Sequence, residues 1–218
     1  MTEPTPPPAK LYNGFSLEHW LEIFSTVVLA VAAVAAAWSG YQAARWNGVQ
    51  AAAYSQAGAR RVEATRAATQ AGQDEIKDLI DFNFYIEANV KQDQDLIKFY
   101  ERRFRNEFAA AFDAWLKTDP INNPDAPASP FVMPQYQDPA QAHAEQLEQE
   151  AEDLFDKGSA ASEQGDAYVL NSVILALALF FAGIAPRFSW LRVRAIVTLF
   201  GLLILLYCLF TLATNPIQ

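Results

Sequence analysis

Few residues in this chain could bind a metal ion. It has two histidines, His19 and His143, and one cysteine, Cys208, which lies inside a long apolar run. A zinc site needs three or four such ligands held together by the fold. We therefore expect no metal site and no cofactor, and we interpret Cys208 as a small buried side chain.

A second group of candidates is a set of carboxylates close to His143. Glu145, Glu148 and Glu152 follow it at spacings that place all of them on parts of one helix surface. Carboxylates arranged in this way could bind a hard cation. A solvated acidic face explains the same pattern and is the interpretation that we favour.

Sequence motifs of the common enzyme classes are absent. The chain has no Gly-x-x-x-x-Gly-Lys phosphate loop, no Gly-x-Ser-x-Gly elbow, no Cys-x-x-Cys pair and no Gly-x-Gly-x-x-Gly run. Together with a helical pattern throughout, this predicts a protein that is not an enzyme. We expect no catalytic residue and no small-molecule substrate.

The apolar residues are gathered into three runs, although the chain carries a net charge of -9. The runs cover residues 23–37, 169–185 and 195–213. As helices they reach roughly 22 to 28 Å, and uncharged flanks extend each of them towards the ~30 Å hydrocarbon core of a bilayer. The sequence therefore predicts an all-α integral membrane protein with three transmembrane helices. A long extramembrane helical domain is inserted between the first and the second.

Prolines, glycines and charges divide the chain further. We expect a disordered proline-rich tail at 1–15, the first transmembrane helix at 16–44, extramembrane helices at 45–117 and a proline-rich loop at 118–139. We then expect an acidic helix at 140–168, the second transmembrane helix at 169–185, a basic loop at 186–194 and the third transmembrane helix at 195–213. The pair Asp138-Pro139 is a strong helix start. Gly158 and Gly165 are expected to loosen the chain before the second span.

Small residues recur along the first span and beyond it. Ala32, Ala36, Gly40 and Ala44 are four residues apart, which predicts a face for close helix packing in lipid. Ala57, Ala64 and Ala71 are seven residues apart, which predicts a tightly packed alanine seam. Plain helix propensity explains the second repeat equally well.

Residues 74–116 have the periodicity of one amphipathic helix with an aromatic face. Its apolar positions step by three and four, and we expect them to form a domain core rather than an exposed surface. They are Ile97, Tyr100, Phe104, Phe108, Ala111 and Trp115. In the following loop, six prolines in 22 residues exclude a helix, and Phe131, Val132 and Met133 form either a docking element or a plug over the helices.

The distribution of charged residues indicates the orientation of the chain in the membrane and the class of partner that it binds. The loop 186–194 holds three arginines and no acid, which favours a cytoplasmic loop and an extramembrane domain outside, although the flanks of the first span favour the reverse. Residues 47–166 contain 11 basic and 22 acidic residues, a net charge of -11. Nucleic acid is therefore not an expected partner, whereas the lipid bilayer, further copies of the chain or an envelope protein are.

Several segments resemble a widespread family of bacterial three-span membrane proteins of unknown function. They are residues 38–46, the run 104–127 with its Phe-Asp-Ala-Trp-Leu-Lys-Thr-Asp-Pro, and residues 165–170 and 180–184. The resemblance covers nearly the whole chain. It implies a location in the bacterial plasma membrane and assigns no functional residue.

Two functions fit these expectations. The first is a non-enzymatic membrane protein whose helical domain mediates assembly or contact with another protein. The alternative is a homo-oligomeric channel with an acidic vestibule, in which Glu22 of several chains would form a charged ring at the pore entrance. An isolated interfacial position explains Glu22 as well.

Overall fold

The computed structural model describes residues 17–218, and within that range it contains helices and no strand. The predicted tail at 1–15 lies outside the described residues, as does Ser16. The all-helical prediction is confirmed. The described chain divides into two compact units. Unit 1 comprises residues 17–52 and 157–218, and unit 2 comprises residues 53–156.

Two long helices contribute residues to both units. They are α1 (Leu17–Val90) and α4 (Pro139–Ile184), and both are rich in alanine, which has the highest helix propensity. Helix α4 begins at Pro139, as predicted, and Oδ1 of Asp138 accepts the backbone N–H of Ala140 at 2.8 Å. Neither Gly158 nor Gly165 interrupts it.

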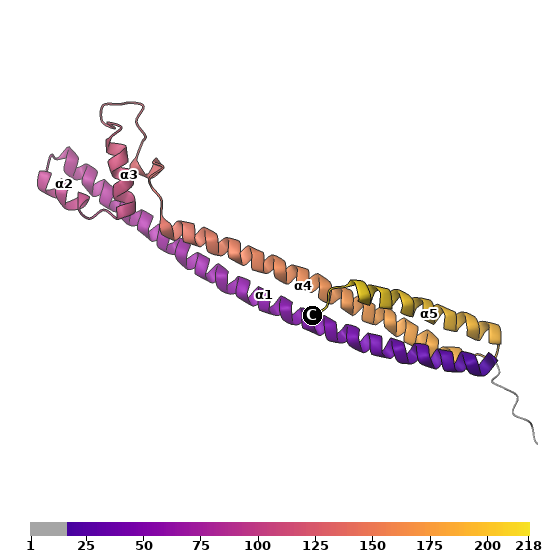
Figure 1. Ribbon diagram of the computed structural model, residues 1–218. Coiled ribbons are helices and arrows are strands. Elements are labelled where there is room, and N and C mark those ends of the chain that lie inside the picture. Colours follow the sequence, from indigo (N-terminus) through magenta and orange to yellow (C-terminus); the bar gives the residue numbers. More distant parts are fainter. Residues whose placement is uncertain (1–16) are drawn as a thin grey trace, which may run out of the picture. The chain divides into compact units, whose positions relative to one another are not determined.

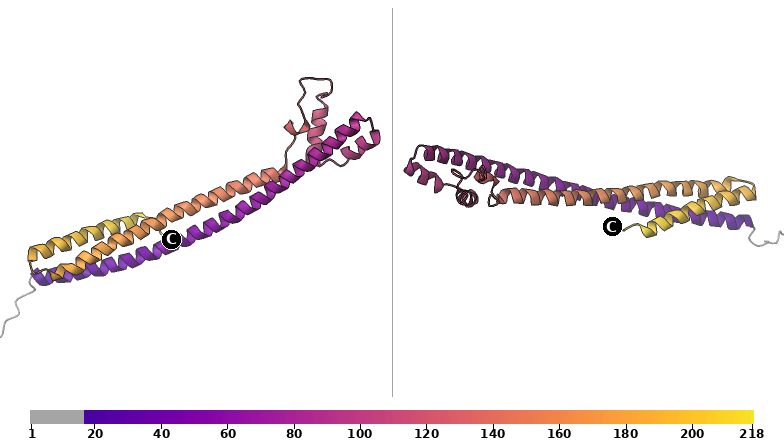
Figure 2. Two further views of the ribbon diagram at one scale, coloured as in Figure 1. Left: turned by 180° about the vertical axis from the view of Figure 1, so that it is seen from behind. Right: turned by 90° about the horizontal axis from the view of Figure 1, so that it is seen from above.

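In unit 1 the first part of α1, the last part of α4 and α5 (Leu191–Thr214) lie side by side (Figures 1 and 2). The 3-10 helix η2 (Ala185–Arg187) begins the connector to α5. Three of the described helices are long and apolar enough to cross a membrane, namely α1, α4 and α5.

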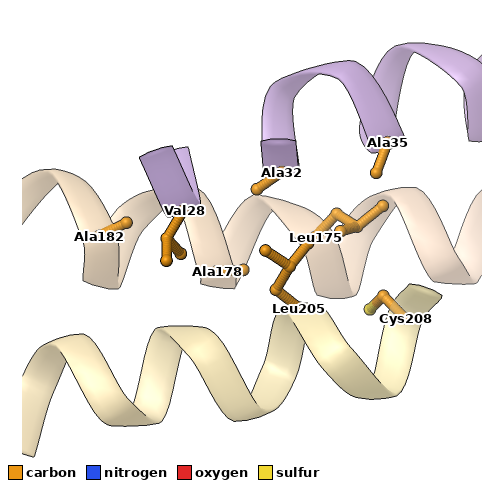
Figure 3. Packing of buried hydrophobic residues seen from close by; sticks show 8 residues of the cluster. All are labelled: Val28, Ala32, Ala35, Leu175, Ala178, Ala182, Leu205 and Cys208. Carbon is orange, nitrogen blue, oxygen red and sulfur yellow. The ribbon is translucent and has the colours of Figure 1, made fainter. Parts of the chain in front are cut away.

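Small side chains fill the space between these three helices (Figure 3). The buried cluster consists of Val28, Ala32, Ala35, Leu175, Ala178, Ala182, Leu205 and Cys208. Two glycines extend the close packing. A Cβ atom on Gly165 would lie 2.7 Å from Oδ1 of Asn47, and one on Gly201 would lie 3.3 Å from Cβ of Phe181. The prediction that Gly165 loosens the chain is wrong, because its missing side chain lets α1 and α4 approach closely.

Hydrogen bonds between buried side chains join the same three helices. Oγ of Ser25 and Oγ1 of Thr198 lie 3.0 Å apart. Thr211 donates to Oδ1 of Asn171 at 2.9 Å, and Nδ2 of Asn171 donates to Oγ of Ser39 at 3.4 Å. These bonds satisfy polar groups that are buried or half-buried between the helices.

Unit 2 contains the last part of α1, the first part of α4, and α2 (Gln94–Glu101), α3 (Asn106–Leu116) and the 3-10 helix η1 (Pro130–Val132). Its core is a cluster of large apolar side chains, and aromatic rings dominate it. The cluster consists of Tyr85, Ala88, Ile97, Phe104, Phe108, Phe112 and Trp115. The sequence prediction of a core along this stretch is confirmed.

The stretch is not one helix, however. Helix α1 ends at Val90, and Gln92 adopts a positive φ of 55°. Asp93 then caps α2 by accepting the N–H of Leu96 at 3.1 Å, and a second turn separates α2 from α3. The prediction of a continuous helix over 74–116 is wrong because folding back buries rings from both α1 and α3. The exclusion of any helix from the proline-rich loop is also wrong, since η1 makes one 3-10 turn there.

Candidate functional site

The residues proposed for cation binding are exposed along α4. His143, Glu145, Glu148 and Glu152 all face solvent, and Glu145 accepts a hydrogen bond from Gln141 at 2.8 Å. Among residues 17–218, no group of three or more His, Cys, Asp and Glu side chains is arranged to hold a metal ion. The carboxylates are therefore spread along a solvated face.

Glu22 and Cys208 both lie in unit 1. The side chain of Glu22 is 60% exposed, and its Oε2 lies 3.7 Å from Nη2 of Arg194. Cys208 is a free, buried cysteine in the cluster of small residues (Figure 3). Polar side chains within the apolar helices of unit 1, such as Ser25, Asn171 and Thr211, form hydrogen bonds within the chain, so they contribute to helix packing.

The predicted small-residue stripe follows the buried face of α1 only at its beginning. Ala32 is buried and Ala36 is half-buried, whereas Gly40 and Ala44 are exposed. Steps of four residues drift by about 40° around a helix, so the stripe leaves the interface within three steps. The buried positions of α1 in unit 1 instead alternate by three and four up to Gln42, which is followed directly by a further buried residue, Ala43. The alternating positions are Ser25, Val28, Ala32, Ala35, Ser39 and Gln42.

The alanines spaced seven apart are buried in unit 2. Ala57, Ala64 and Ala71 line the side of α1 that faces the first part of α4, whose buried positions are Ala144, Leu147 and Ala151. Nε of Arg60 lies 3.3 Å from Oε2 of Glu150, and the rings of Tyr54 and Phe155 stack at 5.2 Å between centroids. The two helices therefore pair through small residues, with larger residues at the edges.

The candidate docking loop is half-buried at Phe131 and Met133 and exposed at Val132. The Phe131 ring lies 5.1 Å from that of Phe108 between centroids, and Met133 also packs against the aromatic cluster. Only Val132 is strongly exposed, at 64%. Nε1 of Trp115 donates to the carbonyl of Pro127 at 2.7 Å and holds the preceding segment. Phe131 and Met133 therefore pack on the aromatic cluster, whereas Val132 is free to contact solvent.

A cluster of charged side chains lies beside this core, and the sequence did not reveal it. Arg105, at the start of α3, donates to Oδ2 of Asp78 at 2.8 Å and to Oδ2 of Asp138 at 3.0 Å, and its Nη1 lies 3.0 Å from Asp74. Asp78 is fully buried, and its Oδ2 also accepts the hydroxyl of Tyr136 at 3.1 Å. The charge cluster therefore joins α1, α3 and the start of α4.

Both donors of the charge cluster have raised pKa values. Hydrogen bonding to Asp78 raises the pKa of Arg105 and outweighs the loss of hydration that opposes it. Burial, followed by the negative charge of Asp78, raises the pKa of Tyr136. Both side chains are protonated at neutral pH and donate to Asp78, and the raised pKa values extend that protonation to higher pH. A charge cluster that is paired in this way positions helices and leaves no free base or nucleophile.

On α1 in unit 2, six large apolar side chains are exposed, and four of them lie within residues 76–84. Ile76, Leu79, Ile80 and Phe84 are each between 46% and 59% exposed. At about 100° per residue, Ile76 and Ile80 lie nearly opposite the buried Asp78, and Phe84 lies about 120° from Asp78 around the helix. We call these four residues the apolar strip. The ring of Phe84 stacks on that of Tyr100 at 5.6 Å between centroids, which connects the strip to α2.

The sequence contained a partial signal for both features. Asp74 and Asp78 are four residues apart and so share a helix face, but their pairing with Arg105 depends on a fold that sequence spacing does not specify. The apolar strip has helical spacing too. The exposure of the strip could not be recognised from the sequence, because core residues such as Phe82 and Tyr85 lie between its members. The helix therefore carries apolar residues on two sides.

Comparison with known proteins adds no assignment: no family model, curated protein or solved structure matches the chain. The resemblance to the bacterial three-span family stays a prediction.

Proposed function

We propose that the chain is a non-enzymatic membrane protein whose unit 2 lies outside the bilayer and binds another protein through the apolar strip. The observation that carries this proposal is the grouping of four exposed apolar side chains, Ile76, Leu79, Ile80 and Phe84, within residues 76–84 of α1. Large apolar patches on water-facing domains are typical of protein–protein contacts. Transferring the exposed half of each side chain from water contributes ~1 kcal/mol, or ~4 kcal/mol for the strip.

The placement of the two units is supported by their surfaces. Unit 1 exposes apolar side chains such as Val34, Phe180 and Phe210, and it contains the apolar windows of all three candidate spans. Unit 2 contains ten basic and twenty acidic residues, which the hydrocarbon core would exclude. We infer a bacterial plasma membrane from the family resemblance. The basic connector between α4 and α5 favours a cytoplasmic connector and a periplasmic or extracellular unit 2.

The charge of unit 2 selects among partners. With a net charge of -10, two copies of unit 2 repel each other, whereas a partner with a basic rim is attracted. We therefore propose a different envelope protein that offers an apolar helix flanked by lysine or arginine. Assembly with further copies of this chain is the competing outcome.

The experiment is site-specific photocross-linking of the full chain in native membranes. A photoreactive side chain at Ile80 should give an adduct with one partner, and the peptide joined to it should be apolar with basic neighbours. The same side chain at Val62, which is 52% exposed on α1 outside the strip, is the matched control.

Substitution tests the same surface. The triple change Ile76→Ser, Ile80→Ser and Phe84→Ser should abolish the adduct, whereas Val62→Ser should leave it unchanged. An adduct between two copies of the chain would show that the apolar strip mediates self-association rather than binding of a different protein. Equal labelling from positions 80 and 62, with a monomeric protein in detergent, would refute the contact function.

A further inference from the structure

The connector between α4 and α5 borders an open cavity of about 330 Å³ in unit 1. Its charged and hydroxyl-bearing lining consists of Arg187, Ser189 and Arg194 on the connector side and Glu18 near the start of α1. We call this space the connector cavity. The proposed protein–protein contact uses none of these residues.

Arg194 lacks hydrogen-bond acceptors for part of its guanidinium group. Its side chain is only 11% exposed, and its Nε and Nη2 atoms are buried without a hydrogen-bond partner in the described part of the chain. The nearest carboxylate, Oε2 of Glu22, lies 3.7 Å from Nη2, which is beyond hydrogen-bond length. Buried donors are almost always paired in folded proteins. A ligand with several acceptor oxygens would complete this site after a small rotation of the guanidinium.

The charges around the cavity favour an anion. Residues 186–194 include Arg187, Arg192 and Arg194 and no acidic residue. Helix α5 begins beside the cavity without a side-chain cap, so its first backbone N–H groups add positive potential. Glu18 and Glu22 oppose an anion. Glu22 is 60% exposed, and water therefore weakens its effect on Arg194.

The position of the cavity indicates the source of the anion. It lies where α4 gives way to α5, at the ends of helices that could span a membrane. The neighbouring Trp190 is 76% exposed, and tryptophan is enriched at the membrane–water interface. At that depth the abundant anion is the phosphate of a phospholipid. Arginine binds such a group through two parallel N–H···O bonds.

We propose that the connector cavity binds the headgroup phosphate of an anionic phospholipid. Arg194 and Arg187 hold the phosphate, and the hydroxyl of Ser189 is a further donor. This inference rests on the proposed placement of unit 1 in the bilayer and is independent of the partner of unit 2.

The test is native mass spectrometry of the full-length protein in detergent, titrated with phosphatidylglycerol. Arg194→Gln and Arg187→Gln should each weaken binding of the first lipid at least about five-fold, since each removes a charge-assisted contact to phosphate. Arg192→Gln is the matched control, because it removes the same charge from the same connector at a residue that does not line the cavity. It should change binding less than about two-fold, because exposed charges are screened.

Glu22→Gln provides an effect of the opposite sign. Removal of the carboxylate that competes for Arg194 should tighten binding about two-fold, and this exposed change should leave folding intact. The melting temperature of each variant is measured alongside. If an arginine variant fails to fold, lipid binding is compared between Glu22→Gln and the unchanged protein. Lipid binding by Glu22→Gln that is equal to or weaker than that of the unchanged protein would refute the site.

Three further outcomes would overturn the proposal. Equal weakening by Arg192→Gln and Arg194→Gln would mean that only the net charge of the connector attracts lipid. Equal retention of diacylglycerol, which lacks phosphate, would exclude phosphate recognition. Inorganic phosphate that competes at equal concentration would show that the ligand is free phosphate rather than lipid. If cross-linking at Ile80 fails while lipid binding is retained, the proposed protein–protein contact is refuted and the lipid site is not.

Discussion

Unit 1 and unit 2 are built on opposite principles. Most buried side chains of unit 1 are small or polar, such as Ala178 and Asn171, although Tyr168 is buried as well. The surface of unit 1 carries large apolar side chains such as Val34 and Phe210. Unit 2 buries large aromatic rings in addition to the alanines between α1 and α4, and it exposes charges. In lipid, apolar burial does not drive helices together, so close packing and hydrogen bonds must do so. In water, burial of large apolar side chains is the dominant stabilising effect. The contrast teaches that each unit is suited to a different solvent.

The largest expected effect comes from emptying the core of unit 2. Phe108 is fully buried in α3, and Phe108→Ala should destabilise unit 2 by ~4 kcal/mol through lost burial and the cavity left behind. Hydrogen exchange of the full chain in detergent should rise over residues 104–116. Leu116→Ala, on the exposed side of the same helix, is the control and should change exchange little. Equal effects would mean that the aromatic cluster is not the stabilising core.

The next effect comes from the charge cluster. Arg105→Met leaves the buried Asp78 without its cation and should destabilise unit 2 by ~3 kcal/mol, as expected for one removed partner of a buried pair. The measurement is thermal unfolding followed by tryptophan fluorescence. The control is Arg102→Met, at an exposed residue that makes no side-chain ion pair in the described chain. A midpoint shift as small as that of the control would show that water already satisfies Asp78.

The sequence predicted the composition of each core better than the path of the chain. Periodicity identified Phe104, Phe108 and Trp115 as one buried face, because helical spacing survives the break between α2 and α3. The turns themselves were not predicted, since residues 91–105 contain neither glycine nor proline. The charge cluster and the apolar strip depend on tertiary contacts, which periodicity along one helix cannot distinguish from a core.

Unit 1 should respond to the opposite change in volume. Ala178 is fully buried between helices, and its carbonyl lies 3.4 Å from where a Cβ on Gly201 would stand. Ala178→Leu should therefore overpack the interface and cost ~2 kcal/mol. Ala176→Leu, on the exposed face of the same helix, should be neutral. Reversible unfolding in mixed micelles measures both. A tolerated leucine at 178 would mean that the small residues of unit 1 do not set the helix spacing.

The raised pKa of Tyr136 predicts a loss of stability at high pH. Tyrosine ordinarily titrates near 10, and burial beside Asp78 keeps the folded side chain protonated above that value. The unfolded chain then releases its proton first, so stability is full below pH 10 and falls by up to ~1 kcal/mol per pH unit above it. Tyr136→Phe should reduce this slope between pH 10 and 11, while Tyr207→Phe, at an exposed tyrosine, should not. An unchanged slope would exclude Tyr136 as its source.

The smallest effect concerns hydrogen bonds in unit 1. Thr211→Val removes the donor to Oδ1 of Asn171, and a side-chain hydrogen bond between membrane helices contributes ~0.6 kcal/mol. Thr214→Val is the control, because that hydroxyl bonds only to carbonyls of its own helix. The difference between the two variants in mixed-micelle unfolding isolates the bond between helices. No difference would assign the cohesion of unit 1 to the packing of small residues alone, and the contrast with unit 2 would then rest on side-chain volume.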